Sequence, residues 1–403
     1  MTCMDPQLSP LAGPVAAPTE GPSTVRLMKF AATFGAGGTE RQFVNLALAL
    51  ESSNFEVSFG CLRRSGRFLD ELEAQGVRVF DYGVCTFKHP QALSAQLRLA
   101  RDIRQLGIDV VHTYNFYANV FAIPAARLAG ARVVASIRDM GPYLSPTQRR
   151  VQRWVCKLAD RIAVNANAIR DWLIADGYDP NRIVVIPNGI DISRFKRRKP
   201  AGKLHSELGL PAGAPLIGVV SRLTRLKGLE DFLRASAIVS RRFPGAYFLI
   251  VGESLTVRGR SLERDTSYPD ELARLAEQLG VRDRVVFVGF RSDVEQILPE
   301  LTVSVLPSLS EGLSNVLLES MASETPVVAT RVGDAVEAVQ DHENGLLVEP
   351  GDSDSLAEAI CRVLESPVLA ARFKHAARRS VADRFSMERM VDSTKRLYES
   401  LLQ

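Results

Sequence analysis

Val303-Ser304-Val305-Leu306-Pro307, followed shortly by Glu311-Gly312-Leu313-Ser314-Asn315-Val316-Leu317-Leu318-Glu319, contains a strand, a turn and a helix in that order. The run 303–306 is short, apolar and rich in valine, which is typical of a buried parallel strand. The run 316–318, continued by Met321 and Ala322, has helical spacing. Repeats of such a unit build a doubly wound α/β sheet.

The same alternation of apolar strands and amphipathic helices runs through the chain from Val25 onward, in two series. Such alternation is expected when crossover helices join parallel strands. The sequence therefore predicts an α/β protein with two doubly wound, Rossmann-like sheets. The predicted strands are 25–34, 55–61, 77–80, 110–113, 133–137, 161–164 and 183–186 in the first series, and 216–221, 247–251, 285–288, 303–306, 327–329 and 345–348 in the second.

The two series define the predicted domain organisation. We expect an N-terminal domain at 25–195, a charged linker at 196–214 and a C-terminal domain at 215–383. Five prolines in residues 1–24 indicate a flexible tail, and 384–403 is predicted to be a helix that packs back toward the first domain. Ligands bind beyond the carboxyl ends of strands in open α/β sheets, so the active site is expected in a cleft between the domains.

Composition excludes several classes of protein. The net charge is +4, from 50 basic and 46 acidic residues, which gives no reason to expect nucleic acid as a partner. The five cysteines are dispersed without a Cys-x-x-Cys pair, which indicates a reducing compartment and no structural metal. No apolar run approaches the roughly 18 residues that span a bilayer. We therefore expect a cytoplasmic protein without a structural metal.

Two carboxylates flank the start of the helix after the strand 303–306. Glu311 lies in the turn, and Glu319 follows about two helical turns later, so both can face one crevice. The amides of Gly312, Leu313 and Ser314 at the helix start can hold phosphate or sugar oxygens. Because a carboxylate accepts two hydroxyl hydrogen bonds at once, this pattern suits a ribose diol or the edge of a hexose.

Two basic residues, Arg222 and Lys227, lie around the turn that follows the first strand of the second series. A guanidinium binds phosphate oxygens bidentately and an ammonium adds a compact charge. Together they would stabilise a departing diphosphate without a metal ion. A solvated basic turn is the alternative interpretation.

A glycine-rich turn, Gly35-Ala36-Gly37-Gly38-Thr39-Glu40-Arg41-Gln42, follows the first strand and opens a helix. Such a turn lets backbone amides approach a ligand closely. The spacing departs from Gly-x-Gly-x-x-Gly because Glu40 occupies the third position, and no acid closes the second strand to bind an adenosine ribose. This disfavours a nicotinamide oxidoreductase, and a simple tight turn remains an alternative.

Taken together, these motifs resemble the retaining glycosyltransferases of family 4. The resemblance also draws on Pro187-Asn188-Gly189-Ile190-Asp191, Thr325-Pro326-Val327-Val328-Ala329-Thr330, Asn344-Gly345-Leu346-Leu347-Val348 and Pro350-Gly351-Asp352, and it covers roughly residues 25–400. It implies a GT-B fold, a nucleoside-diphosphate sugar donor (UDP-linked in our prediction) held by the second domain, and an acceptor on the first. It implies neither a cofactor nor a divalent metal.

The resemblance also assigns donor-binding residues. It places Arg222 and Lys227 on the diphosphate, Glu311 on the sugar hydroxyls and Glu319 on the ribose. The remaining residues implied to bind the donor are Gly289 and Phe290 near the base, Gly37 and Gly38 near the phosphate, and the helix start at Gly312, Leu313, Ser314 and Asn315. Glu337 matches a further acid without an assigned role.

The acceptor side departs from the family pattern. His112 is a candidate catalytic residue, with a buried histidine as the alternative, and Tyr114 replaces the second of two alternating histidines. Arg138 stands where a histidine is common and is followed by Asp139, which favours an anionic or phosphate-bearing acceptor. The predicted acceptor site comprises Arg41, Tyr114, Arg138 and Asp139.

The sequence thus predicts transfer of a sugar to a glycan or lipid-linked acceptor, in the synthesis of cell-surface polysaccharide or glycolipid. An epimerase of the same fold and a non-catalytic glycan- or nucleotide-binding module remain alternatives. The polar loop 252–268 is either a mobile flap or a surface insertion. The basic helix 149–158 either binds the anionic inner face of a membrane or packs its apolar stripe, Val151, Trp154, Val155 and Leu158, on the sheet.

Overall fold

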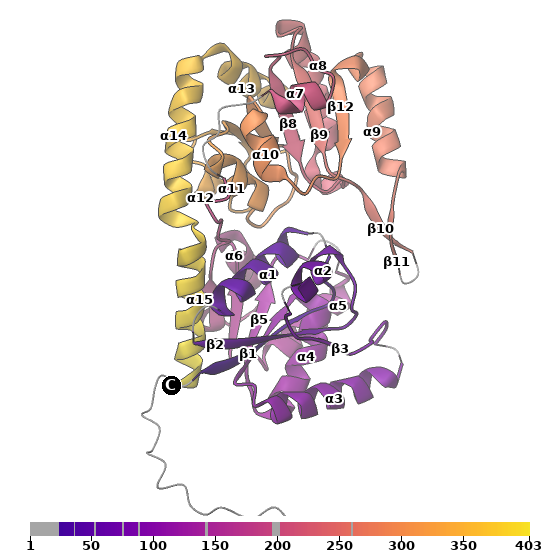
Figure 1. Cartoon of the computed structure of the whole chain (residues 1–403), viewed down its shortest axis with the longest axis vertical. Helices are drawn as coiled ribbons and strands as arrows, with labels where there is room; N and C mark the ends of the chain where they lie inside the picture. The colour runs from indigo at the N-terminus through magenta and orange to yellow at the C-terminus, as the bar shows by residue number, and fades with distance from the viewer. Residues whose placement is uncertain are drawn as a thin grey trace, which may run out of the picture.

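A computed structural model describes residues 24–35, 37–51, 54–74, 76–87, 89–141, 144–195, 202–258 and 261–403. Residues 1–23 of the predicted tail and 196–201 of the predicted linker lie outside the described residues. The described chain forms two α/β domains, one above the other in Figure 1, each built on its own parallel sheet. The predicted fold class is confirmed.

The N-terminal domain contains a seven-stranded parallel sheet of order β3-β2-β1-β4-β5-β6-β7. Helices α3 to α6 cover one face, and α1, α2 and the last helix of the chain cover the other. The strands are β1 (Val25–Ala31), β2 (Phe55–Cys61), β3 (Val79–Asp81), β4 (Val110–Tyr114), β5 (Arg132–Ile137), β6 (Arg161–Val164) and β7 (Ile183–Val185). The helices are α1 (Gly38–Glu51), α2 (Arg67–Ala74), α3 (Gln91–Leu106), α4 (Asn115–Ala129), α5 (Pro146–Cys156) and α6 (Asn167–Ala175).

The C-terminal domain contains a six-stranded parallel sheet of order β12-β9-β8-β13-β14-β15. Its strands are β8 (Leu216–Val220), β9 (Tyr247–Val251), β12 (Val285–Gly289), β13 (Val303–Leu306), β14 (Val327–Thr330) and β15 (Leu346–Val348). Its helices are α8 (Leu229–Arg242), α9 (Ser267–Gln278), α10 (Val294–Ile297), α11 (Asn315–Ala322), α12 (Ala335–Ala338), α13 (Ser353–Glu365) and α14 (Pro367–Arg384). Every strand predicted from the sequence is present, with small differences at the ends.

The order of the strands explains where the motifs lie. Strand order reverses between β1 and β4 in the first sheet and between β8 and β13 in the second. A crevice opens at the carboxyl ends of strands at such a reversal, because the two flanking loops turn to opposite faces. The glycine-rich turn follows β1, the Arg222–Lys227 turn follows β8, and the Glu311 turn follows β13.

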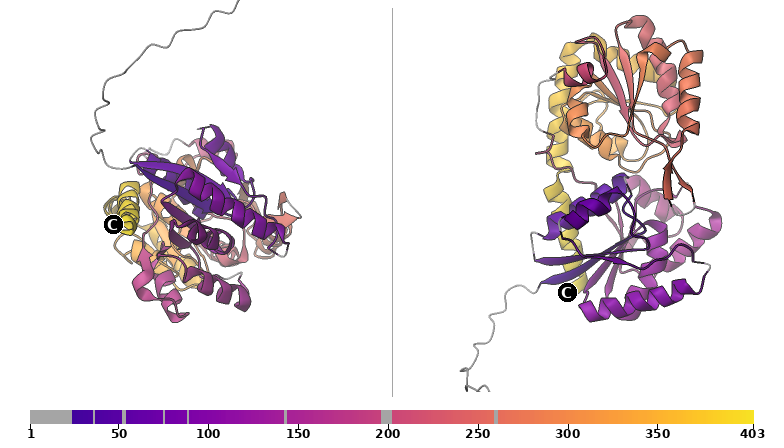
Figure 2. Two further views of the ribbon diagram at one scale, coloured as in Figure 1. Left: turned by 90° about the horizontal axis from the view of Figure 1, so that it is seen from below. Right: turned by 45° about the vertical axis from the view of Figure 1, so that its right-hand side comes forward.

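The two last helices run along one side of both domains (Figures 1 and 2). Helix α14 packs on the C-terminal core through Ala377 and Val381, whereas α15 (Met387–Leu402) packs on the N-terminal core through Met390, Leu397 and Tyr398. Between the helices the chain passes beside Ile190, whose amide donates to the Phe385 carbonyl at 2.8 Å. Both covalent crossings between the domains therefore lie together.

Two segments differ from the sequence-based expectation. The predicted linker contains a short helix, α7 (Lys203–Glu207), with Leu204 and His205 buried, so this part is not a solvated connection. The predicted polar loop contains an antiparallel hairpin of β10 (Leu255–Arg258) and β11 (Ser261–Arg264). Figure 1 shows the hairpin reaching from the C-terminal domain toward the N-terminal domain. The flap remains a hypothesis.

Candidate active site between the two domains

An ion pair joins the two turns at the reversal point of the second sheet. The ammonium of Lys227, after β8, contacts the carboxylate of Glu311, after β13, and both side chains are mostly buried. Ser308 donates a hydrogen bond to the same carboxylate oxygen at 3.0 Å. The second carboxylate oxygen of Glu311 has no hydrogen bond from the described residues, so this turn holds an oriented acceptor for hydroxyl groups.

Glycines allow these turns to approach closely. Gly228 has φ +61°, and a β-carbon there would lie 1.9 Å from the carbonyl oxygen of Pro307. Gly333 has φ +53°, and a β-carbon there would lie 2.2 Å from the carbonyl oxygen of Gly312. Neither position accepts another residue without moving the backbone, so both glycines support the geometry around Glu311.

Arg222 and the glycine-rich turn face each other across the crevice. Arg222 is exposed and forms no ion pair with the described residues. Burial raises the pKa of Glu40 in the first turn of α1, and the nearby charge of Arg222 partly opposes this shift. The carboxylate of Glu40 lies against Gly37, since a β-carbon there would be 2.4 Å from its Oε2. Arg222 of the second domain thus lies close to the first helix of the other domain.

Glu319 lies on α11, the helix that follows the Glu311 turn. Basic residues from other parts of the chain lie near it. Burial raises its pKa, whereas Arg41 from α1 and Arg194 lower it. Arg41 was predicted to bind the acceptor. The structure instead places its charge near Glu319, and its guanidinium stacks over Phe68 at 5.0 Å from the ring centroid.

Side-chain amides join the two domains beside the crevice. The Asn315 amide donates to the carbonyl of Gly38 at 2.9 Å, and its oxygen accepts from Asn188 at 2.7 Å and from Gln42 at 3.3 Å. Asn188 also donates to the Leu313 carbonyl at 3.0 Å. The side chain of Asn315, predicted to bind the donor, therefore holds the domains together.

Further links between the domains lie at both rims. The carboxylate of Asp334 accepts hydrogen bonds from the amides of Asn167 at 2.8 Å and Ala168 at 3.0 Å, where α6 begins. Glu337 accepts from the Asn167 side chain, which gives this motif acid a structural contact. Sequence reasoning missed Asp334, although its place at a helix start is a favourable one for an acid.

The opposite rim is joined by a single basic residue at the start of α2. Arg67 donates to Glu253 at 2.7 Å and lies 3.8 Å from the ring centroid of Phe290. Gly289 ends β12 with φ +78°, and Phe290 follows it. The turn predicted to bind the nucleotide base is therefore in direct contact with the N-terminal domain.

His112, the candidate catalytic residue, is buried on β4. The residue is 2% exposed, and its Nδ1 lies 2.6 Å from the Tyr398 hydroxyl and its Nε2 2.8 Å from the Ser136 hydroxyl. Both ring nitrogens are occupied. Tyr114 is also buried, stacks on His112 and lies in the core under α1, so it offers no surface to an acceptor.

The other two predicted acceptor residues, Arg138 and Asp139, have different surroundings. Arg138 follows β5, is partly buried and donates to the side chain of Asn188. Asp139 is exposed and accepts from the amide of Gly141 at 2.8 Å, which forms a local turn. Arg138 alone of the four predicted acceptor residues lies beside the amide network at the crevice.

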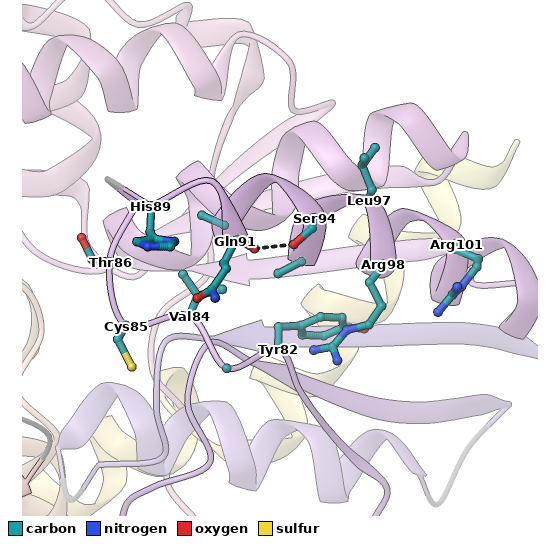
Figure 3. Close-up of a pocket in the computed structure, with 13 residues that line it drawn as sticks. Tyr82, Val84, Cys85, Thr86, His89, Gln91, Ser94, Leu97, Arg98 and Arg101 are labelled. Carbon is teal, nitrogen blue, oxygen red and sulfur yellow. Dashed lines mark hydrogen bonds between the residues drawn. The ribbon is translucent and has the colours of Figure 1, made fainter.

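A second hollow, of about 910 Å³, lies away from these residues at the edge of the first sheet (Figure 3). It is lined by the loop after β3 and by α3, including Tyr82, His89, Leu97, Arg98 and Arg101. Arg98 lies 4.9 Å from the ring centroid of Tyr82. This hollow combines apolar walls with two arginines.

Comparison with known families covers most of the chain. Residues 36–194 match the model described as Glycosyltransferase Family 4, and residues 201–380 match Glycosyl transferases group 1. A D-inositol 3-phosphate glycosyltransferase of Acidothermus cellulolyticus is 30% identical over 78% of this chain and 72% of its own length. The chain belongs to the group 1 glycosyltransferases.

Other relatives of this group 1 glycosyltransferase extend the comparison. An Escherichia coli UDP-Gal:alpha-D-GlcNAc-diphosphoundecaprenol alpha-1,3-galactosyltransferase is 26% identical over 90% of this chain and 93% of its own. The crystal structure of Anabaena HepE in complex with UDP matches with a TM-score of 0.83, at 24% identity, over 93% of this chain and all of that one. The latter likeness establishes the GT-B fold.

The described part of this glycosyltransferase contains neither a helix able to span a membrane nor a cluster of metal-ligating side chains. None of its helices combines the length and apolar character needed to cross a membrane. No group of three or more histidine, cysteine, aspartate and glutamate residues is arranged to hold a metal ion there.

Proposed function

We propose that the protein is a retaining glycosyltransferase that uses a nucleoside-diphosphate sugar, UDP-linked, without a metal ion. The observation that carries this proposal is the Lys227–Glu311 pair, set beside Arg222 at the reversal point of the second sheet and opposite the first helix of the other domain. The pair provides a cation for a diphosphate and a carboxylate for sugar hydroxyls. The UDP in the HepE crystal structure supports the choice of nucleotide.

The proposed chemistry is charge stabilisation of the leaving group. The bond between the anomeric carbon and the diphosphate oxygen breaks, and Arg222, Lys227 and the amides after Glu311 stabilise the negative charge that develops. The acceptor hydroxyl attacks from the face that the diphosphate leaves, which retains configuration. Its proton passes to the departing phosphate oxygen, so no protein base is required.

The acceptor is proposed to be a glycan or lipid-linked carbohydrate of cell-surface polysaccharide or glycolipid synthesis. The E. coli relative is named for a diphosphoundecaprenol-linked acceptor, and the Acidothermus relative for an inositol phosphate. Both acceptors carry phosphate.

The donor and the metal requirement are tested together. Adding UDP at about 100 times its dissociation constant is expected to stabilise the protein by about 2.7 kcal/mol. Transfer or hydrolysis of a UDP-sugar, measured by UDP release, is expected to be unchanged after treatment with EDTA, because Arg222 and Lys227 supply the positive charge. Activity that disappears with EDTA and returns with Mg²⁺ would contradict the metal-independent mechanism.

We also propose that the protein binds the anionic inner surface of a membrane through the layer of α3, α4 and α5. Helix α5 buries Gln152, Val155 and Cys156, not the predicted stripe as a whole. Trp154 is 69% exposed, and Val151 and Leu158 are each 39% exposed. Three of the four residues of the apolar stripe, all except Val155, are therefore available at the surface.

The same face collects most of the exposed apolar side chains in the described part of the chain. Eight of thirteen lie between residues 87 and 158, namely Phe87, Leu93, Leu97, Tyr117, Leu128, Val151, Trp154 and Leu158. Helices α3, α4 and α5 also carry seven arginines and a single acid, Asp102. Apolar side chains beside arginines, including those of the second hollow, suit the headgroup region of an anionic bilayer.

Vesicle sedimentation tests the membrane proposal. Wild-type protein is expected to bind vesicles of phosphatidylglycerol and phosphatidylcholine in equal parts, and to lose binding at high salt. Trp154→Glu should weaken binding about 10-fold or more, because it removes the most exposed anchor and adds repulsion. Val368→Glu, which changes an 82% exposed side chain on the other domain, is the control. Equal binding by both variants would contradict the proposal.

A further inference from the structure

A buried lysine and a partly buried arginine of the N-terminal domain form no ion pair with an acid of the described residues. Lys29 on β1 is fully buried, and its ammonium has no hydrogen-bond partner. It lies between the rings of Phe43 and Tyr114, 5.0 and 5.1 Å from their centroids. Arg138, after β5, donates to Asn188, but its buried Nε has no partner.

The pKa values of both groups are lowered, and the charge of Arg138 contributes to the shift of Lys29. Burial, and secondly the charge of Arg138, lowers the pKa of Lys29 well below its usual range. Burial also lowers the pKa of Arg138. No carboxylate of the described residues forms an ion pair with either group or counts among the causes of these shifts. An unpaired buried cation destabilises a fold by several kcal/mol, so such a site calls for an anion.

The position of Arg138 indicates where that anion would lie. A β-carbon on Gly312 would be 3.3 Å from the backbone oxygen of Arg138 and 3.6 Å from Oδ1 of Asn165. Oδ1 of Asn165 is likewise buried without a partner. The carboxyl ends of β5 and β6 therefore pack against the Glu311–Gly312 turn, beside the crevice between the domains.

We propose that Arg138, supported by Lys29, forms a specificity-determining subsite for an anionic group, a carboxylate or a phosphate, on the substrate that lies against the Glu311–Gly312 turn. This proposal rests on the proposed glycosyltransferase function. The Nε–H of Arg138 has no partner among the described residues and can donate a charge-assisted hydrogen bond to such an anion. An anion held there also favours the charged form of Lys29, whose stabilisation then contributes to affinity.

Calorimetry can separate the two sources of the anion. A carboxylate on the donor sugar is tested by comparing UDP-glucuronic acid with UDP-glucose. A phosphate on the acceptor is tested by titrating inorganic phosphate into UDP-saturated protein. We expect the wild type to prefer UDP-glucuronic acid or to bind phosphate, and either result identifies the source.

Variants test whether Arg138 is responsible. Arg138→Gln should weaken the anionic ligand about 10- to 100-fold while leaving UDP affinity within about twofold, because a charge-assisted hydrogen-bond pair is lost. Arg138→Lys should retain part of the affinity. Lys29→Met should weaken the same ligand less and raise thermal stability, because it removes an unpaired buried amine. Arg132→Gln changes an exposed arginine on β5, the strand that precedes Arg138, and is the control.

The outcomes distinguish the subsite from the proposed function. If the wild type binds UDP but neither prefers UDP-glucuronic acid nor binds phosphate, the anion subsite is wrong and the glycosyltransferase proposal stands. Equal weakening of UDP-glucose and the anionic ligand in Arg138→Gln would also overturn the subsite, since it would indicate a structural role. If the wild type does not bind UDP, the proposed function itself fails.

Discussion

Replacing Lys227 by alanine is expected to lower kcat/KM for sugar transfer by about 10²- to 10³-fold, the usual effect of removing one preorganised charge from a transition state. The change removes the ammonium that contacts Glu311 and leaves that carboxylate without its cation. Negative charge on the departing diphosphate would then lose its closest buried counter-charge. The measurement is steady-state release of UDP from a UDP-sugar in the presence of an acceptor.

Matched variants separate chemistry from folding in this experiment. Lys203→Ala removes an exposed lysine from α7 and should leave the rate within about twofold, since exposed charges contribute little. The double variant Lys227→Ala/Glu311→Gln avoids an unpaired carboxylate, so a rate as low as that of the single variant assigns the loss to the missing cation. Normal transfer by a folded Lys227→Ala protein would refute the proposed mechanism.

Replacing Tyr398 by alanine is expected to destabilise the N-terminal domain by about 3–5 kcal/mol, as large-to-small substitutions of buried aromatic residues do. Tyr398 lies on α15, is fully buried and bonds to His112 on β4. Both tryptophans of the protein, Trp154 and Trp172, lie in the N-terminal domain. Tryptophan fluorescence during urea unfolding therefore reports this domain selectively.

Two companion variants complete the test of α15. Tyr398→Phe keeps the ring but leaves Nδ1 of His112 without the hydroxyl, and it should cost about 1–3 kcal/mol. Tyr117→Ala removes a tyrosine that is 51% exposed and should change stability little. An unchanged tryptophan transition in Tyr398→Ala would mean that α15 is not part of the N-terminal core.

The sheets could be predicted from sequence because buried parallel strands read as short valine-rich runs. Val303–Leu306 and Val110–Tyr114 are fully buried, and both had that pattern. The hairpin of β10 and β11 could not be predicted, because its sequence is polar and neither side of it joins a large sheet. Helix α7 was missed because the basic residues before it indicated a solvated segment, although Leu204 within the helix is buried.

The site was predictable only where it is local in sequence. The Lys227–Glu311 pair follows from two strand ends that a reversal of strand order makes neighbours. The environment of His112 could not be predicted from strand patterns, because its hydroxyl partner, Tyr398, lies 286 residues away in the sequence. Asn315 likewise depends on a contact between domains, and Arg138 on Asn188, 50 residues away; strand patterns encode neither contact.

The route of α15 has a consequence for synthesis of the protein on the ribosome. The sheet formed by residues 25–185 is made long before Met390, Leu397 and Tyr398, yet these side chains complete its core. The part of that sheet face which α15 covers, beside α1 and α2, therefore stays exposed while the whole C-terminal domain is translated. We expect nascent chains of intermediate length to be good clients for chaperones that recognise apolar surface.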